Sequence, residues 1–453
     1  INIRGIEGNR VALQLDGIRQ PEDFVAQAFL GAGGPGRIYF DPAILNQLEV
    51  YKSAASSLYG GDALGGVVEG RTVSPETLLG SELEGTAFTN TATYASVDAS
   101  LNNRLTAATG NGKTAGSLVY SFRDGAEREN NGAIPPNPRD FDSHALVLKG
   151  VYGEETWDIR ATLDGFRYQS FLEGNAAEGS FFNGRVVNDE VTLEEERERL
   201  RASLRGSWKP ANPLPLADSI FWHGYAQEAT TNTRNRQVGQ VQFGPFPTPR
   251  DRVNDITYET RIWGLDLQAE KLAIAGNLFH EIRYGLEWTS SDVESQFLRM
   301  DRQPDGSTTT EDRIGMAPSE VTRLGLFFQD RISIGSDEKW TLTPALRLDA
   351  YEVSPNNTEA FLDRTEVPAT GESIRAIDYD NVALAPSLSV LYRWDDRTNT
   401  YFTYSRGVRN PSAEELNGVF THGADFIVVP NPDLSEEQSD SFEFGFQHAT
   451  TEH

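Results

Sequence analysis

From about residue 84 onward, apolar and polar side chains alternate with a period of two along long stretches of the chain. Within 280–290 the apolar residues occupy every second position and charged or small residues lie between them (Ile282, Tyr284, Leu286 and Trp288 against Glu281, Arg283, Gly285, Glu287 and Thr289). The same alternation occupies 340–351 and 439–447. Because successive side chains of a strand point to opposite faces, these stretches predict antiparallel strands with one apolar face.

About fourteen such strands follow one another at the spacing of a strand plus a turn. The connections between them alternate in length. Long connections are predicted near 125–142, 167–195, 230–255, 292–319, 353–380 and 408–437, and short ones near 153–155, 336–338 and 395–397. The run of Glu residues at 194–198 falls where the third predicted loop returns to its strand, and a solvated face is the interpretation we give it.

A soluble antiparallel sheet can also have one apolar face, but it has no reason to alternate long and short connections. Bacterial outer-membrane barrels do so, because their loops are long on the extracellular side and short on the periplasmic side. The predicted fold class is therefore mostly β, with a transmembrane antiparallel β-barrel over 81–453 that is surrounded by outer-membrane lipid.

Residues 1–80 follow a different pattern, made of short mixed segments. A glycine-rich stretch at 31–36 precedes a predicted short helix that begins at Asp41-Pro42, with proline in its first turn. A strand is predicted from Leu48 to Tyr51. The glycine-rich stretch lacks the Lys-Ser or Lys-Thr of a phosphate-binding loop. We therefore predict a small α+β domain over 1–80.

Composition and charge exclude several classes of function. The chain has no Cys, which excludes disulfides and thiolate metal sites. Its formal net charge of −27 argues against a nucleic-acid partner. No run of about 18 apolar residues is present, so helical membrane spans are excluded. No Ser-His-Asp set or carboxylate pair is tied to a pocket, and we predict that the protein is not an enzyme.

The two ends of the chain suggest a longer protein. The chain begins at Ile1 rather than Met, carries no signal peptide, and ends at His453 directly after a predicted strand. An exported protein needs a leader, and an open sheet edge in lipid leaves backbone groups unsatisfied at a cost of several kcal/mol each. We therefore expect that the sequence is truncated at both ends.

Two stretches of the first domain resemble the plug domain of TonB-dependent outer-membrane receptors. They are Ile3-Arg4-Gly5-Ile6-Glu7-Gly8-Asn9-Arg10-Val11 with Asp16-Gly17-Ile18-Arg19-Gln20, and Asp41-Pro42-Ala43-Ile44-Leu45 through Leu48-Glu49-Val50 to Ser57-Leu58-Tyr59-Gly60-Gly61-Asp62-Ala63-Leu64-Gly65-Gly66-Val67-Val68. In detail they are similar to the branch that takes haem, haemoglobin, transferrin or lactoferrin. The resemblance implies a plug over 1–80 inside a barrel of about 22 strands, a Gram-negative outer-membrane location, and energy from the TonB–ExbB–ExbD complex.

The last long loop carries a second resemblance. Haem receptors of this family have a FRAP box and an NPNL box on either side of a haem-ligand His. Here the first box is Gly407-Val408-Arg409-Asn410-Pro411, with Val for Phe and Asn for Ala, and the second is Asn431-Pro432-Asp433-Leu434. His422 lies between them. The resemblance implies that His422 is the metal ligand to haem iron, which is commonly held by an imidazole.

Three further residues belong to the predicted haem site. Arg406 and Arg409 could pair with haem propionates, since Arg binds carboxylates bidentately. Pairing with acidic groups on the barrel wall or plug is the role that we favour for both, and we expect the same of Arg4, Arg10 and Arg19. Tyr39 could coordinate iron, although a Tyr in such a place more often packs. Receptors of this branch often offer a second axial His on the plug, whereas residues 1–80 contain none.

The leading hypothesis for function is therefore active uptake of haem, either free or taken from a carrier protein such as haemoglobin. A ferric siderophore or another small nutrient is the alternative cargo, favoured by the missing plug His and the imperfect first box. A third hypothesis is a receptor or adhesin whose long loops bind a host protein, although an adhesin needs no plug.

Overall fold

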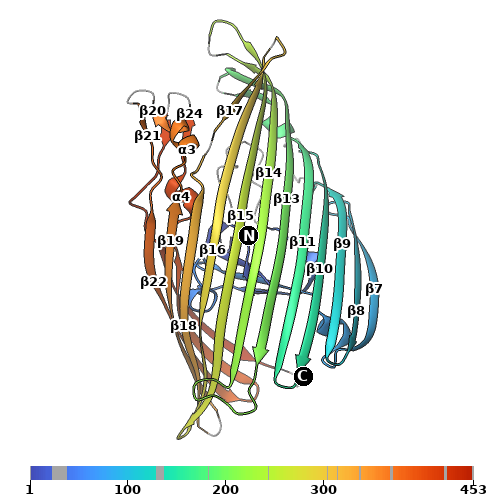
Figure 1. The fold of residues 1–453 in the computed structure, drawn as a ribbon, viewed down its shortest axis with the longest axis vertical. Coiled ribbons are helices and arrows are strands. Elements are labelled where there is room, and N and C mark those ends of the chain that lie inside the picture. The colour runs from blue at the N-terminus through green and yellow to red at the C-terminus, as the bar shows by residue number, and fades with distance from the viewer. Residues whose placement is uncertain are drawn as a thin grey trace.

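The computed structural model describes residues 2–22, 38–128, 137–181, 183–242, 244–303, 305–313, 315–335, 338–367, 371–422 and 426–450, with the side chains of these residues except Val367 and 420–427. A large curved sheet dominates the structure, and a small N-terminal domain lies on its concave side (Figure 1). Within the described ranges, no helix is long and apolar enough to cross a membrane.

The N-terminal domain is built on a four-stranded sheet in the order β4-β3-β6-β5. Its strands are β3 (Val11–Leu15), β4 (Ile18–Arg19), β5 (Leu45–Tyr51) and β6 (Gly66–Thr72), and β3 runs parallel to β6. All five residues of β3 are buried, which explains why this strand is almost continuously apolar. The predicted strand ending at Tyr51 is confirmed as part of β5.

Short elements complete this domain: β1 (Asn2–Ile3), β2 (Ile6–Glu7), the 3-10 turns η1 (Gly8–Arg10) and η3 (Pro42–Ile44), and the helices α1 (Ser56–Tyr59) and α2 (Pro75–Leu79). The helix predicted from Asp41-Pro42 is the single turn η3. The Asp41 carboxylate caps it by accepting a hydrogen bond from the backbone N–H of Ala43 at 2.8 Å.

Fourteen strands form the continuous antiparallel path of the large sheet, as the alternation predicts. They are β7 (Glu84–Ala95), β8 (Ser100–Asn111), β9 (Thr114–Ala126), β10 (Arg139–Glu154), β11 (Trp157–Glu173), β13 (Val186–Trp208), β14 (Ser219–Val241), β15 (Thr248–Ala275), β16 (Leu278–Arg302), β18 (Ser319–Ile334), β19 (Trp340–Pro355), β22 (Tyr379–Asp395), β23 (Thr398–Arg409) and β26 (Glu437–His448). The short β12 (Gly179–Phe181) pairs with β13, and β17 (Thr308–Asp312) pairs with β16. Along the path of fourteen, each strand pairs with the path strands that precede and follow it in the sequence.

The two faces of this sheet differ in polarity and in what they contact. On β10, Leu146 and Leu148 point outward and are 39% and 36% exposed, whereas Ala145 and Val147 are each 1% exposed and belong to a core cluster shared with the N-terminal domain. The outward row continues across the sheet, because Leu148 is the register partner of Leu163 on β11. Apolar side chains on the convex face are what a lipid-facing barrel wall requires.

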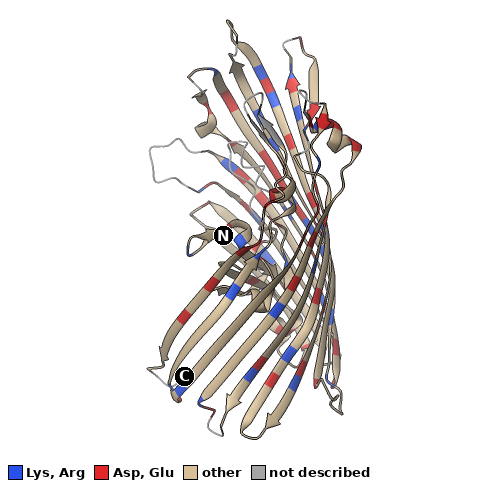
Figure 2. Ribbon diagram, turned by 90° about the vertical axis from the view of Figure 1, so that its left-hand side faces the viewer, with Lys and Arg blue, Asp and Glu red and all other residues tan. Residues whose placement is uncertain are grey.

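The predicted extents of three long connections, 167–195, 230–255 and 292–319, are wrong. The strands continue beyond the apolar rows, so that β14 and β15 have 23 and 28 residues and only 242–247 separate them. The acidic run at 194–198 therefore lies within β13, where Glu194 and Glu198 are exposed and Glu195 is buried on the concave face. Charged residues lie along these extensions of the strands (Figure 2). The extensions therefore carry no row of apolar residues that would show them in the sequence.

Two connections carry short elements at the same end of the sheet (Figure 1). The link from β19 to β22 contains α3 (Glu359–Arg364), β20 (Glu366–Val367) and β21 (Glu372–Ser373), and the link from β23 to β26 contains α4 (Ala413–Asn417), β24 (Phe420–His422) and β25 (Phe426–Val428). A further 3-10 turn, η4 (Asn175–Ala177), follows β11. In α4, Ala413 and Leu416 are buried in a cluster with Ile256 and Tyr258 of β15 and Val353 of β19. The connection that contains His422 thus packs against the concave side of the wall.

Candidate functional site

Arg409 is the last residue of β23 and is 2% exposed. Its guanidinium donates to Glu437 on β26 at 3.0 Å and also pairs with Glu415 of α4. Glu415 closes a capping box with Ser412 at the start of α4. Arg409 therefore joins α4 to the end of the strand, and its charge is neutralised by two wall and loop carboxylates, as the favoured interpretation predicts.

Arg406 does not lie beside Arg409. It pairs with Asp440 of β26 through two hydrogen bonds of 2.9 and 3.1 Å, and the hydroxyl of Tyr404 donates to the same carboxylate at 2.9 Å. Arg406 is an odd number of residues from Arg409, so the two side chains leave the strand on opposite faces. Arg406 thus pairs with an acidic group of the barrel wall, like Arg409.

His422 is the last residue of β24, where it pairs with Phe426 of β25. The side chains of 420–427 lie outside the described residues, so its role as an iron ligand stays a prediction. Among the described residues, no group of three or more His, Cys, Asp and Glu is placed to hold a metal ion.

Tyr39 is 3% exposed and lies between the N-terminal domain and the wall. Its hydroxyl is 2.6 Å from the hydroxyl of Thr231 on β14. The contact attaches the domain to the sheet, which supports the packing interpretation of Tyr39. The glycine-rich stretch at 31–36 that precedes it lies outside the described residues.

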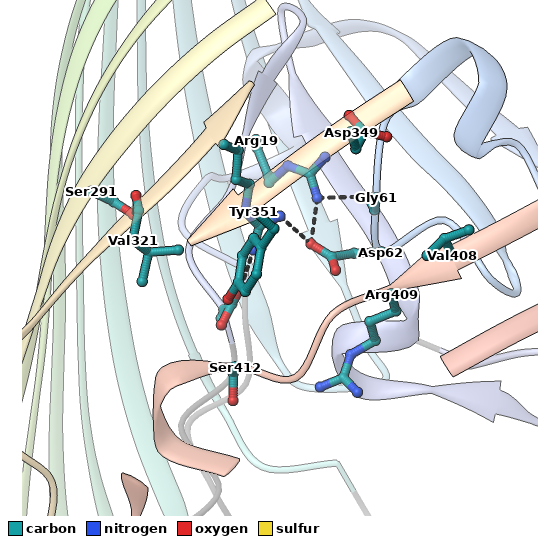
Figure 3. A network of polar contacts seen from close by, with 12 residues as sticks. Arg19, Gly61, Asp62, Ser291, Val321, Asp349, Tyr351, Val408, Arg409 and Ser412 are labelled. Carbon is teal, nitrogen blue, oxygen red and sulfur yellow. Dashed lines mark hydrogen bonds and ion pairs between the residues drawn. The ribbon is translucent and has the colours of Figure 1, made fainter. Parts of the chain in front are cut away.

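The contact between domain and wall centres on Asp62, whose side chain is 7% exposed. Arg19 of the same domain pairs with Asp62 at 2.5 Å (Figure 3). Arg323 of β18 pairs with the same carboxylate at 2.6 Å. Arg323 also pairs with Glu22 at 2.6 Å and lies over the ring of Tyr351, 5.0 Å from its centroid. We call Arg19, Glu22, Asp62 and Arg323 the Asp62 cluster.

Backbone contacts beside this cluster join the domain to the start of the His422 connection. The N–H of Asp62 donates to the carbonyl of Val408 at 2.9 Å, and the N–H of Val408 donates to the hydroxyl of Ser56 at 3.0 Å. Gly407 permits this approach, because a Cβ there would lie 3.0 Å from the carbonyl oxygen of Ala63. The segment after α1 is therefore bonded directly to the last residues of β23.

A second buried group of charges lies around Asp16, which we call the Asp16 cluster (Asp16, Lys149, Asp164, Arg199 and Arg201). Asp16 and Gly17 have φ values of 52° and 80°, as the two-residue turn between β3 and β4 requires. The Asp16 carboxylate accepts from the N–H of Thr72 at 2.9 Å and pairs with Arg201 at 3.0 Å and Lys149 at 3.4 Å. Arg201 pairs with Asp164 at 2.5 Å, and Arg199 pairs with the same carboxylate.

The geometry is that of a small domain held inside a curved β-wall by buried charges, and comparison with known proteins agrees. The family model for the β-barrel of TonB-dependent receptors matches residues 158–451, which is more than half of the chain, and the plug-domain model matches 1–67. The chain belongs to the TonB-dependent receptor family. The N-terminal domain is its plug, and the long sheet belongs to its barrel, so the predicted fold class is confirmed.

Relatives of this receptor include haem- and iron-protein receptors. The haemoglobin-haptoglobin utilization protein B of Neisseria meningitidis serogroup A is 22% identical over 98% of this chain and 60% of its own length. The lactoferrin-binding protein A of N. meningitidis serogroup B is 33% identical over 91% of this chain and 45% of its own. The hemin receptor of Yersinia enterocolitica is 22% identical over 98% and 57%. The chain thus spans about 60% or less of the length of each of these relatives.

Solved structures share the fold. The copper transporter OprC superposes with a TM-score of 0.70 at 15% identity, covering 98% of this chain and 62% of that one. The hemophore receptor HasR of Serratia marcescens superposes with a TM-score of 0.65 at 18% identity, covering 97% and 62%. As a TonB-dependent receptor the protein is located in the Gram-negative outer membrane, and this family consists of transporters rather than enzymes.

Acid is expected to weaken the plug contact at Asp62. Burial opposes ionisation of this carboxyl, but the charges of Arg323 and Arg19 outweigh burial and hold its pKa at about 2, below the ordinary 3.8. Because the folded pKa is the lower one, the contribution of Asp62 to stability is complete above about pH 4 and is lost as the pH falls from about 4 to about 2. Urea titrations of the plug at several pH values should show this loss.

The matched variant for this pH series is Asp62→Asn, which should lose part of the acid sensitivity. The remainder is expected from Asp16: burial opposes its ionisation, but the charges of Lys149 and Arg201 and the hydrogen bonds from Thr72 hold its pKa well below the ordinary range. Identical pH profiles for wild type and Asp62→Asn would contradict the assignment of the Asp62 cluster.

Sequence analysis missed both charge clusters. One signal was present: Arg197, Arg199 and Arg201 occupy every second position of β13, which places all three on one face. The acidic run beside them drew the interpretation toward a solvated loop. Of the plug arginines, Arg10 does pair with the barrel, at 2.6 Å from Glu437. The guanidinium of Arg19 pairs with Asp62 of the plug, and the backbone carbonyl of Arg19 accepts a hydrogen bond from Gln227 of β14 at 3.2 Å.

Proposed function

We propose that the whole receptor imports haem across the outer membrane, with energy from the TonB–ExbB–ExbD complex. The observation that supports transport is the plug itself: buried ion pairs and hydrogen bonds hold it against strands from β10 to β26 on the concave side of the wall. A plug in this place closes a pore, and a closed pore needs an energy source to open it. An adhesin would need neither a plug nor an energy source.

Haem as cargo is supported by the connection between β23 and β26. It packs against the concave side of the wall through α4, is tied to the plug through Val408, and presents His422 between the two boxes that resemble those of haem receptors. The hemin receptor and the haemoglobin-haptoglobin protein named above are each matched over 98% of this chain, at 22% identity. A haem ligand at this place would lie above the plug, at the entrance to the pore.

The test is haem binding by the purified whole receptor, measured as a shift of the Soret band. We expect His422→Ala to weaken haem binding and to alter the spectrum, because an axial imidazole is lost. His144→Ala is the control, since His144 lies on the outer face of β10 and is half-exposed. An unchanged spectrum and affinity for His422→Ala would exclude His422 as the ligand. A wild-type receptor that binds no haem would exclude haem as the cargo.

A second candidate is iron taken from a host protein. The lactoferrin-binding relative is 33% identical, and a transferrin-binding protein A of N. meningitidis serogroup B is 34% identical over 49% of this chain, against 22% for the haemoglobin-haptoglobin protein and the hemin receptor named above. The absence of His from residues 1–80 also favours a cargo other than doubly ligated haem, a ferric siderophore included. Growth on haem, a siderophore, transferrin or lactoferrin as sole iron source separates these cargoes.

A further inference from the structure

The concave face of β10, β11 and β13 carries a row of cations where it meets the plug. We call this set the basic stripe, which consists of Lys149, Arg160, Arg199, Arg201 and Arg205. Lys149 donates to the carbonyl of Thr72 at 3.2 Å, Arg199 donates to Gln20 at 3.2 Å, and Arg160 pairs with Glu76, so these cations point at the plug. The chain as a whole has a formal charge of −27, so a local surplus of cations is notable.

The carboxylates that neutralise the basic stripe come from two different bodies. Asp158 and Asp164 are on the wall, and they pair with Arg160 at 2.8 Å and with Arg201 at 2.5 Å. Asp16 and Glu76 are on the plug. Five cations against two wall carboxylates give a formal charge of +3 for this strip of wall, and the two plug carboxylates reduce it to +1.

Arg205 accounts for the remaining charge. It lies two positions from Ser203 and four from Arg201 on the same face of β13, and makes no ion pair within the part of the chain that the structure describes. From Arg199 to Arg205 the stripe follows six residues of β13, or roughly 20 Å. Since β13 ends at Trp208, the stripe runs from the level of Gln20 toward the short-turn end of the barrel.

The wall around the Asp62 cluster has no such surplus of cations. There the concave face of β15, β16, β18 and β19 sets Asp266, Glu287 and Asp349 against Arg323 and Arg347. Further charges of the same face are paired with each other, Arg283 with Glu270 and Arg331 with Glu281. Where the wall meets the plug, the surplus of cations therefore lies on the β10–β13 side.

From this charge distribution we propose that the basic stripe is a transit site for anionic cargo, which the plug covers with its own carboxylates and exposes when it moves. The proposal rests on the proposed function and adds the class of cargo: a molecule that carries carboxylate or phosphate groups. Displacement of the plug removes Asp16 and Glu76, and leaves Lys149, Arg160 and Arg201 with fewer carboxylate partners. A passing carboxylate replaces the plug carboxylates, and guanidiniums bind such groups bidentately.

The first test compares cargo binding with uptake in cells that express the whole receptor, with haem as the probe because of its two propionates. Arg205→Glu places an anion in the stripe and should lower the initial rate of haem uptake about tenfold, while haem binding at the cell surface stays unchanged. Arg205→Gln breaks no ion pair and should lower the rate less. Arg261→Gln is the control, because Arg261 is an exposed cation on the outer face of β15. If the wild type takes up haem, equal uptake rates in all four receptors would overturn the proposal.

The second test does not depend on haem. The whole receptor in a planar bilayer, with its plug displaced by urea, is held in a KCl gradient and its reversal potential is measured. We expect Arg205→Glu and Lys149→Gln to shift the reversal potential toward cation selectivity, with no shift for Arg261→Gln. An unchanged reversal potential would overturn the transit site. If the wild type takes up no haem but the reversal potential shifts as expected, the proposed function fails and the transit site stands.

Discussion

Replacing Asp62 with alanine is expected to weaken docking of the plug by about 3–5 kcal/mol, the usual cost of removing one member of a buried ion pair. The carboxylate of Asp62 is 7% exposed and lies between Arg19 and Arg323, each within 2.6 Å. Without it, Arg19 has no ion-pair partner among the described residues, and Arg323 keeps only Glu22. Two largely buried cations, Arg19 and Arg323, would then be neutralised by one carboxylate, that of Glu22.

The measurement is hydrogen exchange of β5 and β6 in the whole receptor as urea is raised, which reports release and unfolding of the plug separately from the barrel. Arg10→Ala is the matched control, because it removes a plug–barrel ion pair whose side chains are 46% and 37% exposed. An exposed pair contributes below about 1 kcal/mol. Asp62→Asn preserves the volume of the side chain, and its loss of docking free energy should lie between those of Asp62→Ala and Arg10→Ala. An effect of Asp62→Ala no larger than that of Arg10→Ala would contradict the account.

Much of the barrel wall could be predicted from alternation alone. Leu286 and Trp288 lie on one face of β16 because their parity is the same, and Trp288 is 39% exposed on the convex side while Glu287 reaches Arg347 on the concave side. One face of the wall contacts lipid and the other faces the plug. This difference in surroundings imposes the alternation of apolar and polar residues. The number of strands followed directly from counting such stretches.

The ends of the strands could not be predicted in this way. In β15 the residues from Thr248 to Arg261 continue the ladder, but most of their outward side chains are polar or charged, among them Asp255, Glu259 and Arg261. Once the outward face leaves the apolar band, water solvates that face and its apolar row ends, although Ile256 and Tyr258 on the inward face stay buried against α4. Strand pairing there is held by backbone hydrogen bonds, which leave no trace in side-chain hydropathy.

Partners in the candidate site were equally hidden. Alternation indicates which face a residue occupies, but Asp62 and Arg323 are separated by 261 positions, and Arg10 and Glu437 by 427. Only the curvature of the wall around the plug brings them together. For Arg409 the sequence favours pairing with acidic groups on the wall or plug, and the structure pairs it with Glu437 of the wall and with Glu415 of α4.

The central claim is that the plug closes the pore and must move for cargo to pass. A disulfide between plug and wall tests it directly, and the chain has no Cys to interfere. Ser57 in α1 and Ser387 on β22 lie with their hydroxyl oxygens 3.0 Å apart, close to what a disulfide with Cβ atoms about 3.5–4.5 Å apart demands. Ser389 and Thr403 on β22 and β23, with hydroxyls 3.2 Å apart, offer the matched control within the wall.

The decisive measurement is therefore uptake of iron-bearing cargo by cells that carry the whole receptor with Ser57→Cys and Ser387→Cys, before and after reduction. We predict that the oxidised receptor binds cargo but takes up almost none, that a reductant restores uptake, and that the Ser389→Cys, Thr403→Cys receptor takes up cargo in both states. Uptake that stays at the wild-type rate while the Ser57–Ser387 disulfide is fully formed would contradict a plug that must move.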